Sequence, residues 1–65
     1  MNIKIARIQK RMSQKQLGEM LGVTYQTVSR WENGAMLPTT ENLIKLSDIL
    51  GVSTDFLLGR KAYEN

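Results

Sequence analysis

Few side chains in this sequence could perform acid–base, nucleophilic or metal chemistry. The 65-residue chain contains no cysteine and no histidine, which excludes thiolate and imidazole ligands, disulfide bonds and Ser-His or Cys-His nucleophile pairs. Its six acidic residues occur singly, without the spacing of a paired-carboxylate site or a calcium loop. The sequence therefore predicts a protein that is not an enzyme and that holds no metal ion or cofactor.

The distribution of charge is more informative than the net charge of +3. Residues 1–30 carry six cationic side chains and one carboxylate, a net charge of +5, whereas residues 31–59 carry one lysine and four carboxylates, a net charge of −3. Residues 60–65 add +1. A basic front half is typical of proteins that meet a polyanion from one side, although an ordinary solvated surface accounts for the same asymmetry.

Nothing in the sequence indicates a membrane segment. No apolar run approaches the ~20 residues that a membrane-spanning helix needs, and the start of the chain lacks the apolar core and cleavage site of a signal peptide. A basic amphipathic membrane helix over residues 2–12 is disfavoured because capped helices follow it. We expect a cytoplasmic protein with one small domain, since a chain of this length buries only about 60% of its unfolded surface.

Glycine and capping residues divide the chain into five short helical segments. A hydroxyl residue begins each of the last four segments, and a glycine ends each of them, as is typical of helix caps. Ser13 and Gln16 also form a capping-box pattern. The predicted segments are residues 2–11, Ser13–Gly22, Thr24–Gly34, Thr39–Gly51 (after Pro38) and Ser53–Gly59.

The apolar pattern indicates which faces of these helices point inward. In the first segment two stripes compete, one with Ile3 and Ala6 and the other with Ile5 and Ile8, and the sequence does not decide between them. In the later segments the residues expected to face inward are Leu17, Met20, Leu21, Val28, Trp31, Leu43, Leu46 and Leu50.

The stretch from Gln14 to Trp31 is the most informative part of the chain. It holds two helices of about eight residues joined by residues 22–24, a connection suited to a sharp helix-turn-helix. Gly18 lies mid-helix, where glycine costs about 1 kcal/mol relative to alanine, which indicates close approach of the two backbones. Gly22 supplies the positive φ of the turn. We predict an all-α, compact five-helix bundle with the helix-turn-helix in its second and third helices.

Residues 14–34, QKQLGEMLGVTYQTVSRWENG, closely resemble the helix-turn-helix of the phage repressor and Cro family. The resemblance continues through Leu37-Pro38, residues 41–47 (ENLIKLS) and residues 50–59 (LGVSTDFLLG), and it covers about residues 3–59. It implies sequence-specific binding to double-stranded DNA by a transcriptional regulator of the repressor type. It also implies that a recognition helix at about residues 25–32 enters the major groove.

The same resemblance implies which residues read bases. Gln26 can bond adenine at N6 and N7, Arg30 can grip guanine at O6 and N7, and Tyr25 can meet a thymine methyl group or a phosphate. The alternative is that the polar side chains of this helix merely solvate it. The full set of base-reading positions is Tyr25, Gln26, Thr27, Ser29 and Arg30.

Other matched positions imply contacts with phosphate groups. Gln14 lies in the first turn of the preceding helix, where the family bonds a backbone phosphate, and Lys15 follows it. Asn33 and Gly34 match a loop whose backbone amides face phosphates. We expect residues 1–59 to form the DNA-binding domain and residues 60–65 to be a C-terminal tail.

A third group of matched positions has structural roles, with Gly18 and Gly22 shaping the turn. The family pairs an arginine and a glutamate at Arg7 and Glu32, so we expect an ion pair that joins the first helix to the end of the third. Trp31 could be a base-stacking platform, but its spacing from Val28 places it in the core.

The sequence departs from the family at two places. Gly18 stands where the family usually has alanine, and the uncharged residues 35–37 stand where a basic residue often follows the Asn-Gly turn. Two other interpretations stay open, namely an antitoxin or accessory protein-interaction module on the same fold, and a fragment of a longer repressor. We also expect a homodimer on a two-fold symmetric operator, with contacts through residues 56–58 and the tail.

Overall fold

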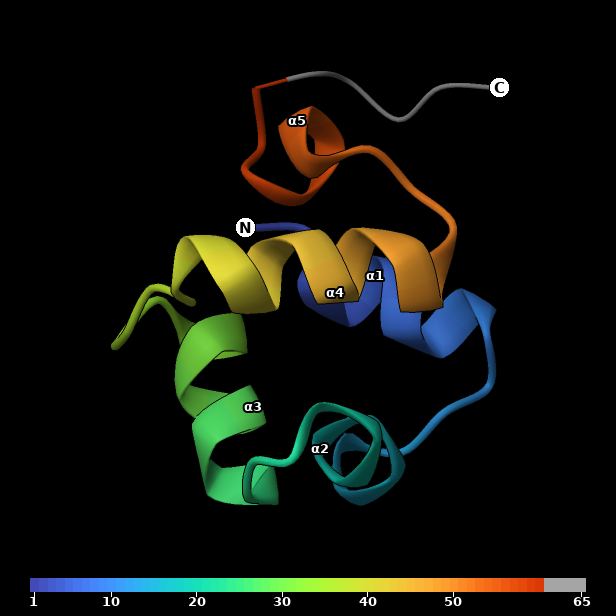
Figure 1. Ribbon diagram of the computed structural model, residues 1–65, viewed down its shortest axis with the longest axis vertical. Coiled ribbons are helices and arrows are strands. Elements are labelled where there is room, and N and C mark those ends of the chain that lie inside the picture. The colour runs from blue at the N-terminus through green and yellow to red at the C-terminus, as the bar shows by residue number, and fades with distance from the viewer. Residues whose placement is uncertain (61–65) are drawn as a thin grey trace.

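The computed structural model describes residues 1–60 and shows five α-helices in this part of the chain (Figure 1). Their bounds are α1 Ile3–Gln9, α2 Gln14–Leu21, α3 Tyr25–Asn33, α4 Thr40–Leu50 and α5 Thr54–Leu57. No strand occurs among the described residues. The predicted all-α five-helix fold is confirmed, with α2 and α3 as its helix-turn-helix.

The helices are arranged around α4, the longest of them (Figure 1). In this view α1 lies largely behind α4, and the short α5 lies above α4, where its Phe56 and Leu57 carbonyls accept hydrogen bonds from Asn2 at the start of α1. α3 descends from the N-terminal end of α4, and α2 lies at the foot of α3, where the two pack against each other. None of the helices in residues 1–60 is long and apolar enough to cross a membrane.

The ends of α2 to α5 follow from local chemistry. Ser13 Oγ accepts from the Gln16 backbone N–H at 3.0 Å while Gln16 Oε1 accepts from the Ser13 N–H at 2.8 Å, which completes the predicted capping box. The side chains of Thr24, Thr39 and Ser53 cap the next three helices in the same manner. Glycines in the left-handed conformation end α2, α3 and α4.

The first helix is shorter than predicted, ending at Gln9 rather than near residue 11. Asn2 makes no side-chain cap; its amide Nδ2 donates to the Phe56 carbonyl at 2.9 Å, and its backbone N–H donates to the Leu57 carbonyl at 2.9 Å. The N-terminus is therefore tied to α5. At the other end Arg11 has φ +56°, the one positive φ of a non-glycine residue among residues 1–60.

We predict that Arg11→Gly will raise the free energy of unfolding by about 0.5–1 kcal/mol. An L-residue in the left-handed region costs about 1–2 kcal/mol, and the greater flexibility of unfolded glycine offsets part of the gain. Lys10→Gly is the matched control, because Lys10 has φ −87° and should only lose stability. Chemical denaturation followed by circular dichroism measures both. An Arg11→Gly variant no more stable than the parent would contradict the inferred strain.

The core consists of one cluster to which every helix contributes. Of the two apolar stripes of α1, the one with Ile3 and Ala6 lies in the core, whereas Ile5 and Ile8 are about half exposed. Removing such side chains from water supplies most of the stability of a domain this small. The buried apolar residues are Ile3, Ala6, Leu17, Leu21, Val28, Trp31, Leu46, Leu50, Phe56 and Leu57.

Two predictions about burial were wrong. Met20 was expected to face inward, but it lies on the outer side of α2 and is 59% exposed. Phe56 and Leu57 were expected to contact a second copy, but they are 6% and 0% exposed because α5 packs them into the core with Ile3. Only Leu58, at 40%, is exposed in that segment, and residues 61–65 of the predicted contact lie outside the described residues.

Candidate nucleic-acid interface

α3 has one face in the core and one in solvent. Val28 and Trp31 are spaced three residues apart on the buried face and are 0% and 2% exposed. The spacing places Gln26 and Arg30 on the other side and Tyr25 at the border between the two faces, and all three are exposed. Because the two buried anchors fix the rotation of α3 about its axis, the exposed side chains leave the protein in a defined direction.

Three of the exposed side chains of α3 are free to bind a ligand. Tyr25, Gln26 and Arg30 have no side-chain hydrogen bond or ion pair to any residue in the described part of the chain. A glutamine amide offers a donor and an acceptor side by side, and an arginine guanidinium offers a rigid fork of donors. The face can therefore recognise a flat molecule that presents paired acceptors and donors at its edge.

The two hydroxyl residues predicted to read bases are already engaged. Thr27 is half-buried, and its Oγ1 lies 3.1 Å from Oγ1 of the N-cap Thr24. Ser29 is also half-buried, and its Oγ accepts from Asn33 Nδ2 at 3.4 Å. Their hydroxyls serve the helix itself, so they contribute less free hydrogen-bonding capacity to the exposed face than Gln26 and Arg30.

A tight turn sets the angle between α2 and α3. Gly22 has φ +74°, and the Val23 N–H donates to the Gly18 carbonyl at 2.9 Å. A Cβ at residue 18 would lie 2.7 Å from the Val23 carbonyl oxygen, which is closer than real Cβ atoms approach. Glycine at residue 18 lets the incoming backbone of the turn rest directly on α2, as its mid-helix position suggested.

A cluster of polar side chains joins the first three helices. Glu32 on α3 accepts from Arg7 Nε on α1 at 2.7 Å and from Arg7 Nη2 at 3.2 Å. Gln14 at the start of α2 donates through Nε2 to the same carboxylate at 3.0 Å. The side chains of Arg7 and Glu32 are 11% and 2% exposed, and Arg7 Nη1 also donates to the Met12 carbonyl at 2.8 Å. The structure thus pairs the two residues expected to be partners and adds Gln14 to them.

The remaining predicted phosphate contacts lie at opposite ends of the motif. Lys15 is exposed beside Gln14 and has no ion-pair partner within residues 1–60. Asn33 and Gly34 end α3, with Gly34 at φ +78°. Their backbone therefore turns away from the helix axis directly after the exposed face.

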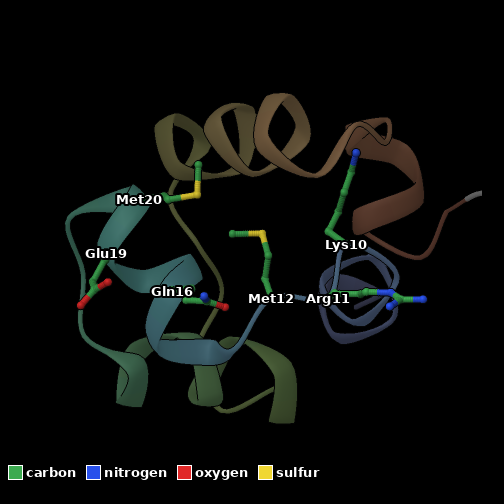
Figure 2. Close-up of a pocket in the computed structure, with 6 residues that line it drawn as sticks. All are labelled: Lys10, Arg11, Met12, Gln16, Glu19 and Met20. Carbon is green, nitrogen blue, oxygen red and sulfur yellow. The ribbon is translucent and has the colours of Figure 1, made fainter.

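A shallow hollow lies between α2 and the segment that joins it to α1 (Figure 2). Met12 and Met20 extend into this space, and the guanidinium of Arg11 points away from both of them. Its charged lining residues are a single carboxylate and two cations, and no three acidic side chains gather anywhere in residues 1–60. The residues that line it are Lys10, Arg11, Met12, Gln16, Glu19 and Met20.

Residues 3–57, which include all five helices, match the profile of a protein family described as helix-turn-helix. The chain belongs to the helix-turn-helix family. The helix-turn-helix itself is α2, the turn closed on Gly18, and α3. The helix-turn-helix fold that the resemblance implied is therefore confirmed.

Relatives of this helix-turn-helix chain include phage proteins. It is 46% identical over 56 residues to YonR, an uncharacterized transcriptional regulator derived from prophage SPbeta of Bacillus subtilis, covering 86% of this chain and 52% of YonR. It is 40% identical over 50 residues to the transcriptional repressor RstR of a cryptic phage in Vibrio cholerae, covering 77% and 45%. It is 39% identical over 56 residues to repressor protein C2 of Salmonella phage P22, covering 86% and 26%. The chain spans about half, or less, of the length of these relatives.

Sequence reasoning missed two features of this helix-turn-helix. The bond from Gln14 to Glu32 joins residues 18 positions apart on different helices, and no local pattern signals it. The left-handed backbone of Arg11 was missed because glycine, asparagine and aspartate are the residues that signal this conformation.

Proposed function

We propose that this chain acts as a transcriptional repressor that binds double-stranded DNA sequence-specifically, and that α3 reads the DNA in the major groove. The observation that carries the proposal is the free, exposed set of Tyr25, Gln26 and Arg30 on a helix whose opposite face is locked in the core. A helix so presented fits the major groove, which is wide enough to admit it. The relatives named as regulators and repressors support the same function. Its site of action would be the cytoplasm, with phage or bacterial DNA.

In this proposal Gln26 and Arg30 specify the sequence. Gln26 bonds adenine at N6 and N7, and Arg30 bonds guanine at O6 and N7, because each pairing satisfies two hydrogen bonds at once. Tyr25 contacts a thymine methyl group or a phosphate. Thr27 and Ser29 add smaller contacts, since their hydroxyls are already hydrogen-bonded within the protein.

The phosphate contacts position the protein and carry no sequence information. Gln14 is suited to this role because its amide has two N–H donors, and the bond to Glu32 uses only one of them. The second is left for a phosphate oxygen. Lys15 adds a free cation beside it. The exposed backbone of Asn33 and Gly34 would lie beside the phosphates at the other end of α3, but the Gly34 N–H already donates to the Trp31 carbonyl at 3.3 Å, so this contact would be the weaker one.

We propose further that two copies bind a two-fold symmetric operator. One recognition helix covers only part of a helical turn, and proteins of this type pair half-sites about one turn apart. Leu58 and Arg60 are the parts of the predicted contact that are exposed on the described chain. Sedimentation with the operator should show two protomers per duplex, and a single protomer per duplex would refute the dimer.

The direct test of the proposed function is selection of bound fragments from a pool of random duplex DNA. We expect a short, two-fold symmetric sequence to emerge and to be protected by the protein in footprinting. The selection reports binding and the half-site together. A pool that shows no enrichment over rounds in which the protein stays folded would overturn the proposal.

Variants of Arg30 and Gln14 should distinguish a residue that recognises a base from a residue that only contacts a phosphate. Arg30→Ala should weaken operator binding by ~1–3 kcal/mol and relax preference at one base pair, with a much smaller effect on non-specific DNA. Gln14→Ala should weaken operator and scrambled duplexes by similar factors. Binding titrations measure the affinity of each variant for the operator and for the scrambled duplex, after thermal melts confirm that each variant is folded. An equal loss for Arg30→Ala on the two duplexes would make Arg30 a phosphate contact instead.

A further inference from the structure

The connection between α3 and α4 is an apolar loop in the middle of a charged chain. No charged residue occurs from residue 33 to residue 40, between Glu32 and Glu41. Within this loop Met36 is 43% exposed and Leu37 is 71% exposed, the largest exposed fraction of any large hydrophobic residue in the described chain. These side chains are not required by the core, which excludes both of them.

The backbone holds this loop in place against α3. The N–H groups of Ala35 and Met36 both donate to the Arg30 carbonyl, at 2.9 and 3.3 Å, below the left-handed Gly34. At the far end Thr39 caps α4. Figure 1 shows the loop projecting outward where α3 meets α4. Met36 and Leu37 therefore lie in a loop that directly follows α3, and the backbone of Met36 is tied by a hydrogen bond to the residue that presents the Arg30 side chain.

We infer that Met36 and Leu37 contact DNA through its apolar surface, beside the groove that α3 reads. The inference rests on the proposed function, because the loop directly follows the proposed recognition helix and is hydrogen-bonded to the carbonyl of Arg30. Deoxyribose carbons and thymine methyl groups are the apolar parts of DNA, and leucine and methionine are among the side chains that proteins lay against or between its base steps. The loop that follows α3 then contacts DNA through apolar side chains and not through a cation.

This contact has a thermodynamic signature that a basic loop does not have. A cation that neutralises a phosphate releases counterions and steepens the fall of affinity with salt, whereas an apolar contact releases none. Leu37→Ala and Met36→Ala should each weaken operator binding by roughly five- to tenfold, given ~25 cal/mol per Å² of buried apolar surface. The slope of affinity against salt, on logarithmic axes, should stay that of the parent. Ile44→Ala is the matched control, because Ile44 is 53% exposed on α4 and should bind as the parent does.

A second variant locates the loop independently of the alanine results. Met36→Lys combined with Leu37→Lys should make the salt slope steeper by about 0.9 for each phosphate that the new cations reach, whereas Ile44→Lys should leave it nearly unchanged. An unchanged slope for the lysine pair would overturn the inference by showing that the loop faces away from DNA. Loss of affinity in Leu37→Ala that is matched by loss of the dimer in sedimentation would also overturn it, in favour of a contact between copies. Failure of the parent to bind any selected duplex would instead refute the proposed function itself, and that is seen before any variant is compared.

Discussion

Replacing Glu32 with alanine should lower the free energy of unfolding by about 3–5 kcal/mol, because it strands a buried charge. The Glu32 side chain is 2% exposed and accepts three hydrogen bonds, two from Arg7 and one from Gln14. Without the carboxylate, the guanidinium of Arg7, whose side chain is only 11% exposed in the intact protein, keeps only the Met12 carbonyl as a partner. A domain of this size has little stability to spare, so the variant should be mostly unfolded near 37 °C. Urea denaturation at lower temperature measures the loss.

The chain offers a matched control for this prediction. Glu41 also forms an ion pair, with Lys45 at 3.7 Å, but these side chains are 80% and 51% exposed. Glu41→Ala should therefore cost only about 0.3–0.5 kcal/mol. A double replacement, Arg7→Met with Glu32→Leu, should recover much of the stability lost by Glu32→Ala, because it removes both charges and keeps the volume. Equal losses for Glu32→Ala and Glu41→Ala would show that burial does not govern the pair.

Local chemistry made most helix boundaries predictable from the sequence. Hydroxyl caps and left-handed glycines act within one turn of the helix end. Ser13, Thr24 and Gly22 therefore predict where α2 ends and where α2 and α3 begin without any information on packing. α1 lacks both signals. Its start is held by Asn2 through bonds to α5, which is more than 50 residues away, and its end by Arg11 in a conformation that arginine rarely adopts.

The faces of the helices were predictable only in part. The spacing of Val28 and Trp31 correctly indicated the outward direction of Gln26 and Arg30, because α3 is amphipathic. Periodicity does not say how wide a strip a neighbouring helix covers, however. Met20 lies at the edge of such a strip and stays in solvent. The link from Gln14 to Glu32 depends on the angle between α2 and α3, which no pattern within one helix contains.

The angle between α2 and α3 depends on the close approach of the turn to Gly18. Gly18→Val should therefore lower the free energy of unfolding by about 2–3 kcal/mol. A Cβ there would lie 2.7 Å from the Val23 carbonyl oxygen and 3.3 Å from the Thr24 carbonyl carbon and oxygen. These are backbone atoms and cannot rotate away, and a valine side chain has little rotamer freedom in a helix. The turn or α2 must move to make room.

The neighbouring residue provides the control, because Glu19 is exposed on the same helix and forms no ion pair within residues 1–60. Glu19→Val should lose only about 0.5 kcal/mol of helix propensity.

The variant Gly18→Ala distinguishes an effect on the stability of the domain from an effect on the angle between α2 and α3. Alanine gains about 1 kcal/mol of helix propensity, which offsets much of the cost of displacing the turn. The resemblance to the phage repressor and Cro family implies alanine at this position, so we expect this variant to fold. Because α3 follows the displaced turn, Gly18→Ala should weaken operator binding clearly even though its melting temperature stays close to that of the parent. Matching melts for Gly18→Val and Glu19→Val would show that the close approach at residue 18 does not constrain the fold.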